Sequence, residues 1–195
     1  MTELYDWNPM PHTVDVKCPQ CSGCAVFEFA EVVKINLKSD VPHFQACDAF
    51  EYKMFKDSCG HKWHGAVYYL GLHGGSVNAI YDLPKGYAAT DWNHSKYLYR
   101  SHGLDIGSLN CPICKTNKKH VLSWPSSAFY AITYKQALLW VFNRESAQDL
   151  KNFIKSSDRS ERSYKWASFL LHVPSKFKAQ KARESVVKKL SKLLS

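Results

Sequence analysis

Cys18-Pro-Gln-Cys21 and Cys111-Pro-Ile-Cys114 are two closely matched C-P-x-C stretches in this sequence. In a zinc knuckle, a tight turn points backbone N–H groups at two cysteine sulfurs, and the pair supplies half of a tetrahedral zinc site. The sequence therefore predicts one zinc ion held by four thiolates, those of Cys18, Cys21, Cys111 and Cys114. The chain between the two turns, residues 22 to 110, is 89 residues long, which is more than a compact zinc ribbon has.

A second grouping of ligands stays open. The stretch Asp57-Ser-Cys-Gly-His-Lys-Trp63 has the pattern of another ribbon knuckle, but Asp57 stands where a C-x-C pair would need a thiolate. A histidine, His61 or His64, or Asp57 itself would have to complete the set. The alternative ligand set is Cys18, Cys21, Cys59 and His61.

Histidines gather in the middle of the sequence, and such a cluster can bind a catalytic metal or carry out acid–base chemistry. If the chain is a metal-dependent hydrolase or nuclease, its site residues are His64, His73, His94, His102 and Asp91. The sequence contains no H-E-x-x-H, no G-x-S-x-G and no phosphate-cradling glycine loop. We therefore expect these side chains to hydrogen-bond long loops, and a non-enzymatic protein is favoured over an enzyme.

Hydrophobic periodicity changes once along the chain. Residues 18 to 72 carry β-branched and aromatic residues partly at period two, and from Leu138 onward the period is helical. The predicted fold class is α+β, with a zinc-knuckle-bearing β-rich body followed by about three C-terminal α-helices. The predicted domains are a zinc-binding β-rich domain at 1–143 and a basic helical region at 144–195 that packs on it.

The first predicted helix has one apolar face and a start signal. Ser146 and Asp149 stand at capping-box spacing. A second helix is expected around Tyr164 to Leu171, and a last one from about Ser175, after Pro174. The residues expected to be buried near the first helix are Trp140, Phe142, Leu150, Phe153 and Ile154.

The charge of the chain is concentrated at its C-terminal end. The whole chain carries a net charge of +9, and residues 144–195, with 13 basic and 5 acidic side chains, account for +8 of it. The last predicted helix has an apolar face of Ala179, Ala182, Val186, Leu190 and Leu193. Beside that face lie four lysines that could contact phosphates or another anionic partner: Lys178, Lys181, Lys188 and Lys192. The alternative is an ordinary solvated surface helix.

Several classes of protein are disfavoured by composition. No stretch of the 195 residues approaches the roughly 20 apolar residues that span a bilayer, so no membrane association is expected. The first residues lack the pattern of a secretory signal, so a cytoplasmic protein with reduced cysteines is expected. The predicted function is a zinc-stabilised, non-enzymatic protein that contacts nucleic acid, or a protein bound to it, through the basic helix. A protein–protein adaptor whose aromatic surface binds another protein is the other alternative, and the sequence leaves the oligomeric state open.

The sequence resembles a set of uncharacterised bacterial proteins that are labelled for a ribbon-like zinc motif. The likeness covers most of the chain, and the C-P-x-C turns are its specific motifs. The other matching stretches are Trp63-His64-Gly65, Gly71-Leu-His-Gly-Gly75, Trp92, Ser95-Lys-Tyr-Leu-Tyr-Arg100, Leu139-Trp140, Asn143-Arg-Glu145, and the end from Leu170 to Leu194. The resemblance implies zinc and a dedicated domain, and it brings no reaction and no catalytic residues.

Overall fold

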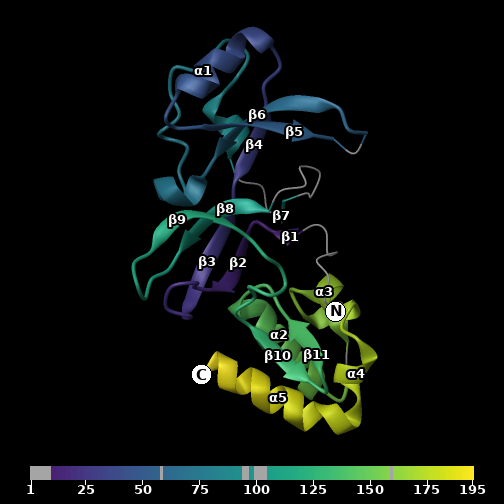
Figure 1. Ribbon diagram of the computed structural model, residues 1–195. Helices are drawn as coiled ribbons and strands as arrows, with labels where there is room; N and C mark the ends of the chain where they lie inside the picture. The colour runs from purple at the N-terminus through teal and green to yellow at the C-terminus, as the bar shows by residue number, and fades with distance from the viewer. Residues whose placement is uncertain (1–9, 58, 94–96, 99–104, 159) are drawn as a thin grey trace. The chain divides into compact units, whose positions relative to one another are not determined.

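The computed structural model shows an α+β protein, so the predicted fold class is confirmed at that level (Figure 1). The structure describes residues 10–57, 59–93, 97–98, 105–158 and 160–195, and within them it has small antiparallel sheets and five α-helices. The chain forms two compact units. The domain division at residue 143 stays a prediction.

The sheet β4-β6-β5 organises one unit. Its strands are β4 (Glu31–Lys34), β5 (Glu51–Lys56) and β6 (Lys62–Tyr68), and both outer strands run antiparallel to β6. The end of β6 is buried on both faces. Ala66 and Tyr68 belong to one apolar cluster, and Val67 belongs to another with Phe55 and Ile106, as the period of two along a strand requires.

Three helical segments of this unit contribute buried residues to the cluster that contains Ala66: Phe44 of α1 (Val41–Ala46), Leu70 of η2 (Leu70–His73) and Trp92 of η3 (Ala89–Trp92). A further short helix, η1 (Lys38–Asp40), has no buried residue. The rings of Phe50 and Trp92 lie 4.8 Å apart between their centroids, and Phe44 packs edge-on against Phe50 at 5.2 Å. The indole Nε1 of Trp92 donates a hydrogen bond of 3.1 Å to the carbonyl oxygen of Ala66, which satisfies the one polar atom of this buried side chain.

Three further strands of the same unit run antiparallel in the order β3-β8-β9: β3 (Cys24–Phe29), β8 (Ile106–Asn110) and β9 (Asn117–Val121). Gly107 on β8 passes so close to the backbone of Glu28 that an added Cβ would overlap the Glu28 carbonyl oxygen. A glycine is therefore required there for the two strands to approach. A short pair is formed by β1 (Met10–Pro11) and β7 (Tyr97–Leu98).

The other unit combines β2 (Thr13–Lys17), the hairpin β10 (Ala131–Tyr134) and β11 (Ala137–Trp140), and helices. Lys135 and Gln136 both have positive φ, 47° and 63°, as a two-residue hairpin turn matched to the twist of its strands requires. The helical segments are α2 (Arg144–Lys155), η5 (Glu161–Ser163), α3 (Ala167–Leu171), α4 (Ser175–Lys178) and α5 (Gln180–Leu194).

The core of this unit is aromatic. Phe142 lies 5.5 Å from Trp140 and 5.2 Å from Phe169 between ring centroids, and Trp124 lies 5.2 Å from Trp140. All five residues predicted to be buried near the first helix are at most 1% exposed, so this prediction is confirmed for Trp140, Phe142, Leu150, Phe153 and Ile154.

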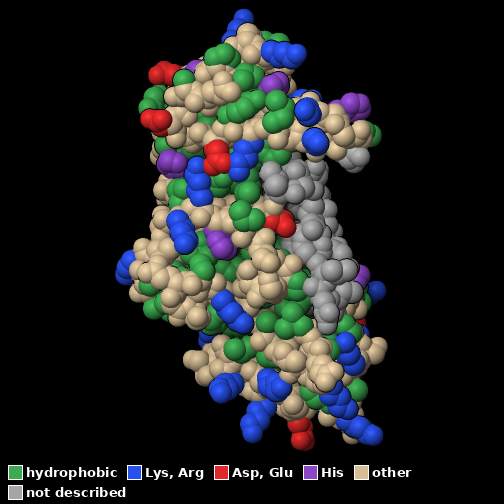
Figure 2. All heavy atoms as spheres, viewed as in Figure 1, with side chains coloured by type: hydrophobic (Ala, Val, Ile, Leu, Met, Phe, Trp, Pro, Cys, Tyr) green, Lys and Arg blue, Asp and Glu red, His purple; other side chains and the backbone are tan. Residues whose placement is uncertain are grey.

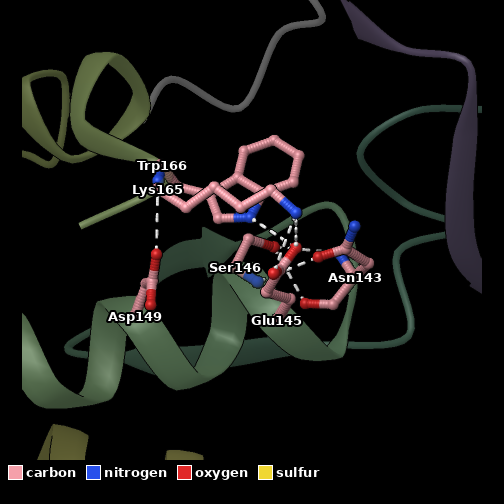
Figure 3. Close-up of polar contacts among 6 residues, drawn as sticks. All are labelled: Asn143, Glu145, Ser146, Asp149, Lys165 and Trp166. Carbon is pink, nitrogen blue, oxygen red and sulfur yellow. Dashed lines mark hydrogen bonds and ion pairs between the residues drawn. The ribbon is translucent and has the colours of Figure 1, made fainter. Parts of the chain in front are cut away.

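The start of α2 is fixed by a network of polar contacts (Figure 3). Asn143 is the N-cap residue: its side chain accepts the backbone N–H of Ser146 at 2.9 Å, and its own N–H donates to the Ser146 hydroxyl at 2.9 Å. The capping box predicted at Ser146 and Asp149 therefore lies three residues too far along the chain. Asp149 instead accepts the backbone N–H of Trp166 at 3.2 Å, and Glu145 forms an ion pair of 2.9 Å with Lys165, so both acids tie α2 to the segment before α3.

The chain after residue 143 has four α-helices in the described residues, instead of about three. The last predicted helix is divided at Ala179, whose ψ of 143° is extended, into α4 and α5. The apolar stripe of α5 is buried, with Leu194 instead of Leu193 as its last member: Ala182, Val186, Leu190 and Leu194. No helix in the described residues combines the length and the hydropathy needed to cross a membrane.

Candidate metal centre

The first C-P-x-C stretch forms a tight turn directly after β2. The N–H of Cys18 donates to the carbonyl oxygen of Gly23, and the N–H of Ser22 donates to the carbonyl oxygen of Cys18, each at 2.8 Å. Ser22 has a φ of 60°, a left-handed conformation that reverses the chain. The backbone N–H of Gln20 points at the Cys18 sulfur at 3.4 Å, which is how a knuckle stabilises a thiolate.

The second stretch repeats this geometry directly after β8. The N–H of Cys111 donates to the carbonyl oxygen of Thr116 at 2.8 Å, so the closing bond again spans five residues. Lys115 has a φ of 59° and lies four residues after Cys111, as Ser22 lies four residues after Cys18. The two C-P-x-C stretches therefore form the same type of turn, with the same closing hydrogen bond and the same left-handed position.

The pairing of β3 with β8 explains how two turns that are 89 residues apart in the sequence can lie close together. β3 begins just after the first turn, β8 ends just before the second, and Val26 pairs with Asn110. This register brings the start of β3 and the end of β8 to the same end of the sheet. The segment between the two turns therefore leaves this end of the sheet along β3 and returns to it along β8.

The ligand atoms of Cys18, Cys21, Cys111 and Cys114 all lie within 4.8 Å of one another, so this group could hold a metal ion. The first cysteine of each turn is buried, each with 1% of its surface exposed, whereas Cys21 is exposed and Cys114 is half-buried. Four sulfur donors at this separation suit a soft or borderline metal with tetrahedral geometry, which zinc and iron–sulfur centres share.

The alternative ligand set is not the one that the structure groups. Within the described residues, Cys59 and His61 come together with Asp57 at the turn between β5 and β6, and neither groups with Cys18 and Cys21. The stretch that has the pattern of a third knuckle is a hairpin turn instead. Its closing bond, from the N–H of Asp57 to the carbonyl oxygen of His61, spans four residues rather than five.

The central histidines have structural partners. The His64 ring shares a hydrogen bond of 2.7 Å with the Tyr52 hydroxyl, and the His73 ring stacks on Tyr68 with 4.8 Å between centroids. Asp91 accepts the backbone N–H of Ala88 at 2.9 Å and so closes the start of η3. His94 and His102 lie outside the described residues. Within the described part of the chain, His64, His73 and Asp91 are in neither group that could hold a metal.

The predicted anion-binding lysines divide between two elements. Lys181, Lys188 and Lys192 are exposed on α5, whereas Lys178 is half-buried at the end of α4. At 100° per residue, the three on α5 lie within about 40° of one another on the face away from the buried stripe, over about 16 Å of helix. We call Lys181, Lys188 and Lys192 the lysine stripe. In Figure 2, Lys and Arg side chains gather on the part of the surface that α5 forms.

One polar cluster has no counterpart in the sequence analysis. Glu51 pairs with Lys53 at 2.7 Å and with Lys119 at 2.5 Å, and it accepts the Tyr69 hydroxyl at 3.1 Å. These residues line a hollow of about 310 Å³ beside β9. No sequence pattern could have revealed the cluster, because Glu51 and Lys119 meet only through the packing of two sheets and lie 68 residues apart.

Comparison with known proteins leaves the family open. No protein-family model matches the chain, and neither a curated protein nor a solved structure matches it significantly. The site is therefore interpreted from its own geometry.

Proposed function

We propose that this chain is a zinc-stabilised, non-enzymatic protein that binds nucleic acid through the lysine stripe of α5. Zinc fits the four thiolates because Zn²⁺ takes four sulfur ligands in closed structural sites. Such a site leaves no coordination position for water or substrate, so its zinc holds two turns together and does no Lewis-acid chemistry. Four reduced thiols fit a reducing compartment such as the cytoplasm.

The observation that carries the proposal is the division of α5 into two faces. One face buries Ala182, Val186, Leu190 and Leu194, and the lysine stripe is exposed. Residues 175–194 contain seven Lys and Arg residues and one acid, Glu184, so little on these two helices neutralises the stripe. A row of exposed cations on a packed helix is suited to bind phosphates, whose condensed counterions it displaces. A protein that is itself bound to nucleic acid is the alternative partner.

The salt dependence of binding tests the stripe. Each lysine that contacts a phosphate contributes about 0.9 to the slope of log affinity against log salt on duplex DNA and about 0.7 on single strands. Replacing Lys181, Lys188 and Lys192 with alanine should therefore flatten the slope by about 2 to 3 units. Fluorescence anisotropy with short DNA and RNA at several ionic strengths measures it.

A matched control separates contact from net charge. The triple variant Lys34→Ala, Lys38→Ala and Lys85→Ala removes the same charge from exposed positions outside α5. It should keep the slope of the parent chain. Equal slopes in the parent and the α5 variant, or no binding of any nucleic acid at low salt, would reject the proposal in favour of a protein partner.

Metal analysis tests the zinc. After dialysis against a weak chelator, the parent chain should retain about one zinc per chain, and Cys111→Ser should retain almost none, because three ligands hold structural zinc far less tightly than four. Cys47→Ser, which changes a thiol outside both candidate groups, should keep the full equivalent. Retention of zinc by Cys111→Ser would show that another ligand set holds it.

A further inference from the structure

The turn between β5 and β6 carries a second group of metal-binding side chains. Asp57, Cys59 and His61 offer one carboxylate, one thiol and one imidazole, and their ligand atoms all lie within 4.8 Å of one another. All three residues are exposed, in contrast to the four-cysteine group, which has two buried sulfurs. The two groups therefore differ both in donor atoms and in access from solvent.

The backbone of the turn holds the carboxylate in place. Asp57 Oδ1 accepts the backbone N–H groups of Cys59 at 2.9 Å and of His61 at 2.8 Å. Asp57 Oδ2 is left on the side of the His61 ring, 3.2 Å from its Nδ1. Hydrogen bonds that orient a ligating carboxylate are what a metal site needs around its first ligands. Gly60, with a φ of 86°, supplies the left-handed residue that lets the chain turn back toward Asp57.

Space lies next to this group. A hollow of about 350 Å³ is lined by Asp57 together with Val32, Lys34 and Trp63. Three protein donors leave at least one of the four positions around a zinc ion open, and an adjoining hollow gives water or a small external ligand room to occupy it.

We propose that Asp57, Cys59 and His61 bind a second, exchangeable zinc ion, with one coordination position open to water or an external ligand. The donor set fits this metal, because zinc accepts thiolate, imidazole and carboxylate together. Binding releases the thiol proton of Cys59 to solvent, since the thiolate is the ligand. This site does not depend on the proposed nucleic-acid binding or on the four cysteines.

Alkylation of Cys59 tests the proposal on the full chain already loaded with one equivalent of zinc. A zinc-bound thiolate is shielded from an alkylating reagent, so added zinc should protect Cys59 saturably. At free zinc ten times the dissociation constant, about a tenth of the Cys59 thiol should stay reactive. Mass spectrometry of the Cys59 peptide reads the rate, and Cys47, half-buried in an apolar cluster, is the internal reference that zinc should leave unchanged.

Two substitutions give the test its specificity. Asp57→Asn keeps an oxygen for the two backbone N–H groups but removes the charge, and His61→Gln removes the imidazole. Each should raise the zinc concentration needed for protection at least about tenfold. Asp82→Asn, in another exposed turn, should protect like the parent. A Cys59 rate that is the same at every zinc concentration, or protection unchanged in both Asp57→Asn and His61→Gln, would overturn the site.

Discussion

At the scale of single residues, Glu51 shows how contacts set a charge. Partial burial disfavours ionisation of its carboxyl, but the hydrogen bonds from Lys119, Lys53 and Tyr69 and the charge of Lys53 outweigh burial and lower its pKa to about 2. Burial, together with the charge of Glu51 and the hydrogen bond to it, raises the pKa of Tyr69. Glu51 is therefore ionised at neutral and mildly acidic pH.

This shift predicts a pH-dependent part of the stability. Because the folded-state pKa of Glu51 lies below its ordinary value of 4.5, its stabilisation is fully present above about pH 4.5 and is lost as pH falls through about 2. The free energy of unfolding of Glu51→Gln should therefore fall below that of the parent at pH 6, and the gap should narrow between pH 4.5 and 2. Urea unfolding at several pH values measures the gap. A gap of constant size would mean that the ionised carboxylate contributes nothing.

At the scale of elements, α2 shows which parts of the fold its sequence determines. Ala147, Leu150, Phe153 and Ile154 are buried as their helical spacing predicts, because a helix in a small domain must bury its one apolar face. The N-cap was not determined in this way. The pair Asn143 and Ser146 has the same spacing as the pair Ser146 and Asp149, so the local pattern fits a helix start at either one. Asp149 and Glu145 instead contact the segment before α3, which leaves Asn143 as the N-cap.

Truncation of the buried face of α2 should be costly. Phe153 is 1% exposed and packs edge-on against Tyr164 with ring centroids 6.0 Å apart. Phe153→Ala should lower the free energy of unfolding by about 3 to 5 kcal/mol, through lost burial and the cavity left behind. Leu171→Ala, at an exposed apolar residue of α3, should change it by less than about 0.5 kcal/mol. Equal effects in the two variants would contradict the packing of α2.

At the scale of the whole molecule, the sequence predicts features that depend on short spacings between residues. It does not predict contacts between segments that lie far apart in the chain. The two C-P-x-C turns and the buried stripe of α5 follow from short spacings in the sequence. Asp57, Cys59 and His61 are local as well, because they stand within five positions of one hairpin turn. The cluster around Glu51 is different, since two sheets assemble it from residues that lie far apart in the sequence.

The length of the segment between the two C-P-x-C turns, 89 residues, also affects the entropy of the chain. The entropy lost when a chain segment is closed into a loop grows only with the logarithm of its length, about 0.6 kcal/mol for each doubling. A compact ribbon closes a segment of about 20 residues, so 89 residues add little more than two doublings. A metal bound by both C-P-x-C turns would therefore close this long segment at an added cost near ~1 kcal/mol compared with a short ribbon. The length of the segment is consequently a weak constraint on the four-sulfur group, and we expect the group to tolerate residues inserted into or removed from exposed loops between the two turns.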